Sequence, residues 1–382
     1  MDRQCRAGRP SFLLVVCMAV AMLLFTSACG GSSGGGTTTQ TVTIAMTPTL
    51  SVIDASTTLQ YTATVSGATN TGVTWSITEG STGGSVSSTG LYTAPTTSGT
   101  YHIVATSVAD TTQTVTATVY VDAAVSSWAL SWNDEFTGTS DTAPDSTKWV
   151  HDTGGYGWGN SELECYTDST DNSYQDGNGN LVISALSSPS HTCSDGNVNN
   201  YTSARLKTQT LFTQTYGRFE ARIKLPYGAG IWPAFWMLGS NITTVSWPSC
   251  GEVDILENVP SLGESTIQST IHMPSPTSSS TNISLGTKNT LASGETNDGE
   301  YHIYGVIWSP GKVSFYVDDY TKPFVTYTAV DAANAGGKWV FNTPFFLILN
   351  TAVGGSWPGS PDSTTVWPQN MYVDYVRVYT AE

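Results

Sequence analysis

Apolar and polar residues alternate with a period of two in many short stretches of the chain. Phe219, Ala221, Ile223 and Leu225, for example, occupy every second position of one such stretch. Because successive side chains of a β-strand point to opposite faces, this pattern places one apolar face of the strand on a core. After Trp128, no segment repeats with the helical period over a dozen residues. These features predict an all-β protein.

The N-terminus has the pattern of an export signal. Several arginines precede the apolar run Phe12–Phe25, which is followed by small residues and Cys29. A basic segment, an apolar segment and a small-residue cleavage site are the three parts of a signal peptide. We therefore expect residues 1–28 to be removed and the chain to be exported.

Cys29 and the Gly/Ser/Thr-rich residues 29–40 resemble the lipid-attachment site and tether of bacterial lipoproteins, although Thr26 stands where leucine is usual. The resemblance implies lipidation of Cys29 and a cell-surface or outer-membrane location. Two alternatives remain open. Ordinary cleavage would give a secreted protein, and the apolar run also approaches the length of a short membrane anchor. We expect membrane contact only through this N-terminal segment.

Residues 41–122 are predicted to form a small β-sandwich, because about seven short β-branched stretches, with Trp75 in a central one, are separated by turn-rich pieces. The sequence GLYTAP, Gly90–Pro95, resembles bacterial immunoglobulin-like domains, which implies a spacer or adhesive module. Residues 123–127 are interpreted as a linker. The alternating stretches are Val42–Ala45, Thr58–Val65, Val73–Ile77, Tyr101–Ser107 and Val115–Val121.

Residues 128–382 contain every tryptophan of the chain except Trp75. Many strands in one all-β domain of this length predict a large two-sheet sandwich or jelly roll. We expect a ligand that stacks on aromatic rings to bind in this region. The alternating stretches are Tyr216–Leu225, Tyr301–Trp308, Val313–Val317, Phe345–Asn350 and Tyr372–Tyr379.

The chain is acidic, with a formal net charge of −16, and it has few charged residues of either sign. Nucleic acid and anionic membrane surfaces are therefore excluded as expected partners. Neutral polar residues beside aromatic ones suit a neutral ligand such as a sugar, although extracellular β-proteins have the same composition. We expect the protein to act as a monomer.

Three carboxylates lie in the stretch WPSCGEVDILENV, Trp247–Val259. Glu252 and Asp254 share one face of a strand, but Glu257 has the opposite parity unless a β-bulge near Ile255 or Leu256 absorbs one residue. With a bulge the carboxyl groups of Glu252 and Glu257 can approach to about 5 Å, the separation that retaining glycosidases use. The alternative is an edge strand whose acids face water.

Cys165, Cys193 and Cys250 remain in the exported chain once the N-terminal cysteines are removed or lipidated. Cys165 and Cys193 are the better candidates for a disulfide, because both lie in the polar stretch before Tyr201. Cys250 is then expected to be a free, buried thiol.

Eight motifs in order resemble the bacterial laminarinase-type endo-β-1,3-glucanases of glycoside hydrolase family sixteen. The resemblance covers essentially all of Trp128–Tyr379. The motifs are WNDEF at Trp132–Phe136, GWGNSELECYT at Gly157–Thr167, YTSARL at Tyr201–Leu206, YGRFEARIKLP at Tyr216–Pro226, WPAFWML at Trp232–Leu238, GEVDILE at Gly251–Glu257, FFLILNTAVGGSWPG at Phe345–Gly359 and VDYVRVY at Val373–Tyr379.

The resemblance implies a jelly-roll sandwich with an open cleft and hydrolysis of a polysaccharide with retention of configuration. It implies that Glu252 is the nucleophile, Glu257 the general acid/base and Asp254 the helper between them. Two neighbouring carboxylates do not both ionise easily, so we expect a raised pKa for Glu257. No cofactor is expected in catalysis.

The resemblance also assigns substrate contacts to Trp232, Trp236 and Trp247, which would stack on sugar rings, and to Asn160, Arg205 and His272. Met273 follows His272 where glycine is usual, and Ser161 stands where asparagine is common. Many relatives bind one structural calcium, and the matching positions here are Glu135, Gly179 and Asp374.

Hydrolysis of β-1,3-glucan is the function expected from these motifs, with mixed-linkage β-1,3-1,4-glucan as a second substrate class. A non-catalytic glucan-binding protein is the main alternative, and the three intact carboxylates argue against it. An agarase or carrageenase of the same family is a further alternative, for which a more basic cleft would be expected.

Overall fold

The computed structural model describes residues 40–382. The predicted signal peptide, Cys29 and nearly all of the tether lie outside these residues, and the lipidation prediction is therefore not addressed by the fold. Residues Thr41–Glu382 form one compact unit. Within the described part of the chain, no helix is both long and apolar enough to cross a membrane.

Residues 41–122 form nine strands rather than about seven. They build sheets with the orders β1-β4, β2-β9-β8-β5 and β3-β7-β6 around a core that includes Tyr61, Tyr92 and Ile103. Trp75 lies on β5, an edge strand, and not in a central strand as predicted. The strands are β1 Thr43–Thr47, β2 Leu50–Asp54, β3 Thr58–Gln60, β4 Thr62–Ser66, β5 Val73–Ile77, β6 Ser85–Val86, β7 Leu91–Thr93, β8 Gly99–Ser107 and β9 Thr114–Asp122, with a 3-10 turn at Gly80–Gly83.

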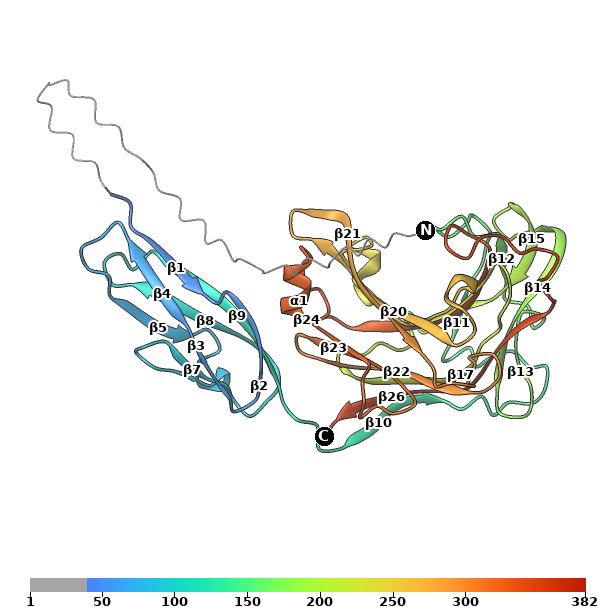
Figure 1. The fold of residues 1–382 in the computed structure, drawn as a ribbon, viewed down its shortest axis with the longest axis horizontal. Coiled ribbons are helices and arrows are strands. Elements are labelled where there is room, and N and C mark those ends of the chain that lie inside the picture. The colour runs from blue at the N-terminus through green and yellow to red at the C-terminus, as the bar shows by residue number, and fades with distance from the viewer. Residues whose placement is uncertain (1–39) are drawn as a thin grey trace, which may run out of the picture. The chain divides into compact units, whose positions relative to one another are not determined.

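Residues 128–382 form a two-layer sandwich of strands with one short helix (Figure 1). The elements are β10 Trp128–Asp134, β11 Val150–Asp152, β12 Glu164–Tyr166, β13 Ser173–Gln175, β14 Leu181–Thr192, β15 Val198–Ser203, β16 Arg205–Lys207, β17 Gly217–Lys224, β18 Ile231–Gly239, β19 Glu252–Glu257, β20 Thr266–Ser275, β21 Ser278–Thr290, β22 His302–Ser309, β23 Lys312–Val317, β24 Val325–Thr328, α1 Ala329–Asn334, β25 Phe345–Val353 and β26 Gln369–Ala381, with 3-10 turns at Ser240–Thr243 and Pro260–Leu262.

The two layers are sheets of ten and seven strands. The ten-stranded sheet has the order β12-β15-β14-β26-β17-β22-β23-β24, with β10 paired to β26 and β13 to β14. The seven-stranded sheet has the order β11-β16-β25-β18-β19-β20-β21, which places the acidic strand β19 well inside it. An all-β sandwich is therefore confirmed.

The alternating apolar residues build the core between the sheets. Phe219, Ala221, Ile223 and Leu225 are all buried in one cluster, as their spacing predicted. Strand β25 is buried along its whole length, which is expected where both neighbours and the opposite sheet cover it. Removing such surface from water contributes roughly 25 cal/mol per Å².

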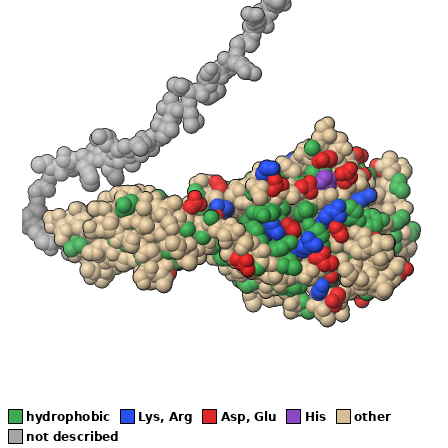
Figure 2. All heavy atoms as spheres, turned by 90° about the horizontal axis from the view of Figure 1, so that it is seen from below, with side chains coloured by type: hydrophobic (Ala, Val, Ile, Leu, Met, Phe, Trp, Pro, Cys, Tyr) green, Lys and Arg blue, Asp and Glu red, His purple; other side chains and the backbone are tan. Residues whose placement is uncertain are grey.

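The outer side of the ten-stranded sheet carries arginines that stack on tyrosines. The guanidinium carbon of Arg218 lies 4.1 Å from the ring centre of Tyr379, and that of Arg377 lies 3.8 Å from the ring centre of Tyr375. Figure 2 shows charged side chains of both signs among hydrophobic ones on one face of this part of the chain. Carboxylates lie beside both guanidinium groups: Arg218 Nε is 3.7 Å from Glu220 Oε2, and Arg377 pairs with Glu135.

Candidate active site

The acidic strand β19 contains the bulge that the parity of its carboxylates requires. Opposite β18, Phe235 pairs with Leu256 and Trp236 with Asp254, so that Ile255 has no partner. The register with β20 shifts in the same interval. Ile255 and Leu256 are both buried, and Glu252, Asp254 and Glu257 all line one cleft. The predicted bulge is therefore confirmed.

The cleft runs across the seven-stranded sheet and has a volume of about 880 Å³. Its floor and walls come from strands β16, β25, β18, β19, β20 and β21, from the segment between β18 and β19, and from the loops before β12 and after β25. The lining residues are Trp158, Gly159, Asn160, Glu162, Arg205, Trp232, Ala234, Trp236, Leu238, Ile242, Trp247, Glu252, Asp254, Glu257, Gln268, Thr270, His272, Asn282, Ser284, Gly286, Asn350, Ala352 and Trp357.

Glu252 and Asp254 form a closely coupled pair. Burial, followed by repulsion from Asp254, raises the pKa of Glu252 to about 8. Burial likewise raises the pKa of Asp254 to about 8. His272 approaches both, with its Nε2 3.1 Å from Asp254 Oδ2 and 3.8 Å from Glu252 Oε1. Two such neighbouring carboxyl groups titrate as a pair and share a proton over part of the pH range.

Glu257 lies at the other end of the bulge. Burial is the largest cause that raises its pKa well above the usual value, and repulsion from Asp254 and Glu252 adds to it. The indole N–H of Trp232 donates a hydrogen bond of 3.1 Å to Glu257 Oε1, which acts in the opposite direction. Glu257 is thus built to keep its proton at a pH where an ordinary glutamate has lost it.

All six residues predicted to contact substrate lie in the cleft. Trp232, Trp236, Trp247, Asn160, Arg205 and His272 line it together with the three acids. Trp247 is 43% exposed, so its ring is open for stacking. Trp236 is more constrained, since its Nε1 donates to Asn350 and the Arg205 guanidinium carbon lies 4.7 Å from its ring centre.

Several lining residues were not singled out from the sequence, among them four with aromatic or polar side chains. Trp158 and Trp357 add aromatic surface, and Glu162 and Asn350 add polar groups. All four lie inside motifs recognised in the sequence, GWGNSELECYT and FFLILNTAVGGSWPG. Their position in these motifs was the only sequence signal that could have identified them. Strand parity does not predict which loop side chains point into a cleft.

The two predicted cysteines form a disulfide, with a Cα–Cα distance of 5.5 Å between Cys165 and Cys193. Cys250 is buried and unpaired among the described residues, and burial raises the pKa of its thiol to about 11. A thiol that stays protonated is a poor nucleophile. Cys250 therefore packs beside the acidic strand without a chemical role.

Two of the predicted calcium positions, Glu135 and Gly179, lie just beyond strands that pair with β26, the strand that carries the third, Asp374, and none of them lines the cleft. Strand β10 pairs Asp134 with Val376, and β14 pairs Leu181 with Val373. Glu135 directly follows β10 and Gly179 precedes β14, so the register places both of them beside Asp374 and its neighbour on β26.

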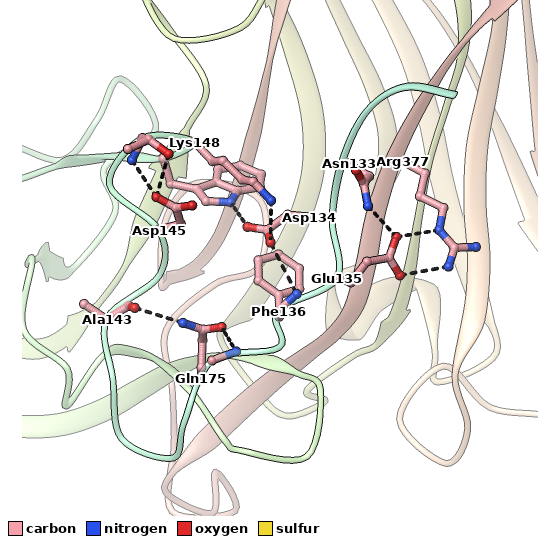
Figure 3. A network of polar contacts seen from close by, with 12 residues as sticks. Asn133, Asp134, Glu135, Phe136, Ala143, Asp145, Lys148, Gln175 and Arg377 are labelled. Atoms are coloured by element: carbon pink, nitrogen blue, oxygen red, sulfur yellow. Dashed lines mark hydrogen bonds and ion pairs between the residues drawn. The ribbon is translucent and has the colours of Figure 1, made fainter. Parts of the chain in front are cut away.

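The carboxylates at this point are held by arginines. Both oxygens of Glu135 accept hydrogen bonds from Arg377, and Asn133 donates to one of them (Figure 3). Arg222 donates to Oδ2 of Asp374 at 2.6 Å. Both oxygens of Glu135 are therefore engaged by donors, whereas Asp374 keeps its second oxygen and the backbone carbonyls remain as further candidate ligands.

Comparison with known proteins places this site in a family. The model of glycosyl hydrolases family 16 matches residues 159–377, more than half of the chain. The chain belongs to this family. The protein is thus a glycoside hydrolase by family, and the matched segment contains every cleft-lining residue except Trp158.

Relatives in the family include glucanases of known name and structure. The chain is 38% identical over 258 residues to the β-glucanase of Rhodothermus marinus, covering 66% of this chain and 85% of that protein. It is 37% identical over 274 residues to glucan endo-1,3-beta-glucosidase A1 of Niallia circulans, covering 68% of this chain but 39% of that longer protein. The catalytic domain of an endo-1,3-beta-glucanase from Thermotoga petrophila RKU-1 is 41% identical with a TM-score of 0.60, covering 67% of this chain and 99% of that one.

Proposed function

We propose that the protein is a retaining endo-hydrolase of β-1,3-glucan, with mixed-linkage β-1,3-1,4-glucan as a second substrate. The observation that carries the proposal is the bulged strand that presents Glu252, Asp254 and Glu257 to one cleft. The glucanase relatives support the choice of substrate.

In the proposed reaction Glu252 attacks the anomeric carbon while Glu257 gives its proton to the leaving glycosidic oxygen. The glycosidic bond breaks, and a covalent glycosyl ester forms on Glu252. Glu257, now a carboxylate, removes a proton from water, and the resulting attack of that water releases Glu252. Asp254 carries the shared proton of the pair, which leaves Glu252 ionised for attack.

The extent of the cleft supports an endo mode of action. It crosses six adjacent strands, from β16 to β21, and neighbouring strands are spaced by about 4.8 Å. A floor of about 24 Å holds several sugar rings at once. A polysaccharide can therefore bind along its length on both sides of the acids.

Product sizing tests this proposal. The protein is incubated with laminarin, lichenan and agarose, and the products are separated by size. We expect short oligosaccharides from laminarin at early times, fewer from lichenan and none from agarose. Glu252→Gln should bind laminarin without hydrolysing it, and undiminished turnover in this variant would refute the role of Glu252. Binding without turnover in the parent protein would instead favour the glucan-binding alternative.

We further propose that residues 41–122 are an immunoglobulin-like spacer and that Cys29 carries a lipid that anchors the exported enzyme at the cell surface. The separate strands and core of residues 41–122 support the first part, and the N-terminal sequence pattern supports the second. Labelling with a radioactive fatty acid should mark the parent chain and spare Cys29→Ala. Equal labelling of both chains would exclude the anchor and leave ordinary secretion.

A structural calcium beside Asp374 is a separate proposal. The register that brings Glu135 and Gly179 to Asp374 supports it, with the second oxygen of Asp374 and backbone carbonyls as ligands. Such an ion would stabilise the ten-stranded sheet and take no part in the reaction. We expect the melting temperature to rise with added Ca²⁺ in the parent and not in Asp374→Asn. Equal melting in Ca²⁺ and in chelator would contradict the site.

A further inference from the structure

A second pair of carboxyl groups lies in the wall of the cleft, on a different element from the catalytic acids. Glu162 precedes β12 and lines the cleft, and Glu164 lies on β12 behind it. Glu162 is 8% exposed and Glu164 is fully buried. The proposed reaction uses neither of them.

A series of hydrogen bonds, in which each group donates to the next, ends on Glu162. The indole N–H of Trp236 donates to Oδ1 of Asn350 at 2.7 Å, which fixes the orientation of that amide. Asn350 Nδ2 then donates to the hydroxyl of Tyr166 at 3.0 Å, so this hydroxyl directs its own hydrogen to Glu162 Oε2 at 3.2 Å. Asn160 Nδ2 donates to Oε1 of Glu162 at 3.0 Å. Both oxygens of Glu162 are therefore acceptors.

Glu164 lies behind Glu162. Its Oε2 accepts from the backbone N–H of Val353 at 2.7 Å, while its Oε1 is buried with no hydrogen-bond partner among the described residues. Burial, followed by repulsion from Glu162, raises the pKa of Glu164 well above its usual value. Glu164 thus keeps its proton, which its unpartnered Oε1 can donate to Glu162.

The backbone around Glu162 is fixed to the loop and strand on the other side of the wall. Ser356 donates to the carbonyl of Asn160 from both its backbone nitrogen and its hydroxyl, at 2.8 and 3.0 Å. Leu163 donates to the carbonyl of Val353 at 2.7 Å. The carboxylate is consequently held in place before any ligand arrives.

The carboxyl group of Glu162 forms no ion pair with the nearby cation. Arg205 also lines the cleft, but its guanidinium lies 3.1 Å from Asp152 and its carbon lies 5.1 Å from the ring centre of Trp158. A fixed carboxylate with unused lone pairs accepts hydrogen bonds from hydroxyl groups. It repels a sulfate ester, which is anionic and has no donor.

We propose that Glu162 is a specificity-determining residue, whose carboxylate binds the hydroxyl groups of neutral glucans and rejects glycans that carry sulfate at the same position. Glu164 is its positioning residue. This inference rests on the proposed glucanase function and names the substrate class within it.

The inference is tested by steady-state kinetics of Glu162→Gln on two substrates, laminarin and laminarin sulfate prepared from the same batch. Loss of a hydrogen bond to a charged acceptor should raise KM for laminarin about tenfold. We expect kcat to change less than twofold, and relative activity on laminarin sulfate to increase. Glu300→Gln, an exposed glutamate outside the cleft, is the matched control. Unchanged KM and unchanged discrimination in Glu162→Gln would overturn the proposal.

Three further variants separate the position of the Glu162 carboxylate from its charge. Glu162→Asp keeps the charge, so it should weaken laminarin binding and still reject the sulfated glycan. Glu164→Leu removes the donor behind Glu162 and should raise KM for laminarin, whereas Glu164→Gln should restore it, because an amide can donate to Glu162 and accept from Val353. Equal KM values for the Leu and Gln variants would exclude the positioning role.

Calorimetric measurement of laminarihexaose binding distinguishes a failure of this inference from a failure of the proposed reaction. If the parent binds the oligosaccharide without cleaving it, the hydrolytic function fails. Weaker binding by Glu162→Gln would then still support the role of Glu162, and equal binding would refute it. If the parent cleaves laminarin and Glu162→Gln binds as well as the parent, only the present inference fails.

Discussion

The indole of Trp232 contacts the acid that is proposed to protonate the leaving group. Its N–H stabilises the ionised form of Glu257 and so lowers the pKa of that carboxyl. Trp357 packs edge-on against the same indole, with ring centres 5.3 Å apart, and limits its rotation. A residue predicted for sugar stacking thus also acts on the acid/base through a hydrogen bond.

Trp232→Phe should therefore raise the pKa of Glu257. With a higher pKa, Glu257 keeps its proton to higher pH, so the alkaline limb of the profile of kcat/KM against pH should move upward. The acidic limb, which reports the Glu252–Asp254 pair, should move less. Trp236→Phe is the control, because its N–H is bonded to Asn350 and not to an acid. A downward movement of the alkaline limb in Trp232→Phe would contradict the assignment.

The raised pKa of Glu164 has a consequence for stability. In the unfolded chain a glutamate titrates near pH 4.3, so above this pH unfolding releases the proton that the folded state retains. The free energy of unfolding of the parent therefore falls as pH rises, by up to about 1.4 kcal/mol per pH unit, until the folded state also loses the proton. Glutamine has no proton to release.

We consequently expect Glu164→Gln to melt at a higher temperature than the parent at pH 8 and to lose this advantage at pH 4. Thermal unfolding followed by circular dichroism at both values measures the difference. Glu300→Gln, which changes an exposed carboxyl, should follow the parent at both values. A variant that is less stable than the parent at pH 8 would show that Glu164 is ionised.

At the scale of the element, the bulge of β19 allows Glu252, Asp254 and Glu257 to line the same cleft. The hydroxyl of Ser269 on β20 donates to the carbonyl of Ile255 at 2.6 Å, and Ser269 is fully buried. This bond satisfies a carbonyl in the interval where the strand register shifts. It therefore helps to fix the position of Glu257 relative to Glu252.

Ser269→Ala should leave the Ile255 carbonyl unsatisfied and cost about 1–3 kcal/mol of stability. We expect kcat on laminarin to fall as well, because Glu257 loses its fixed place. Urea unfolding and steady-state kinetics give the two quantities. Ser314→Ala is the matched control: Ser314 is buried in the ten-stranded sheet and bonds Thr326, so its loss should lower stability with kcat unchanged. A similar fall of kcat in both variants would point to general destabilisation.

At the scale of the whole molecule, every residue that lines the cleft lies after Trp128. Residues 41–122 have strands and a core cluster of their own and contribute nothing to the cleft wall. A fragment of residues 128–382 should therefore hydrolyse soluble laminarin with kcat and KM close to those of the full chain. A fall of kcat/KM beyond a few-fold, in a fragment that unfolds cooperatively, would show that the first 127 residues are needed for catalysis.

Local patterns in the sequence determined much of this fold. Alternation in stretches such as Val73–Ile77 predicted strands, because strand parity depends only on neighbouring residues. The same parity required a bulge between Asp254 and Glu257, and the register confirms it. The number of strands in residues 41–122 and the edge position of Trp75 were wrong, because sheet order depends on partners distant in sequence.

Tertiary structure alone decided which residues meet around the acids. Sequence motifs placed Trp158 and Glu162 in a recognisable stretch, but loop side chains have no parity that predicts their direction. The relay from Trp236 through Asn350 and Tyr166 to Glu162 joins three segments far apart in the chain. Hydrogen bonds between such segments exist only once the sheets have packed. The sequence by itself therefore determined the three carboxylates proposed for catalysis and their strand, whereas the packed sandwich decided their burial and the residues that line the wall beside them.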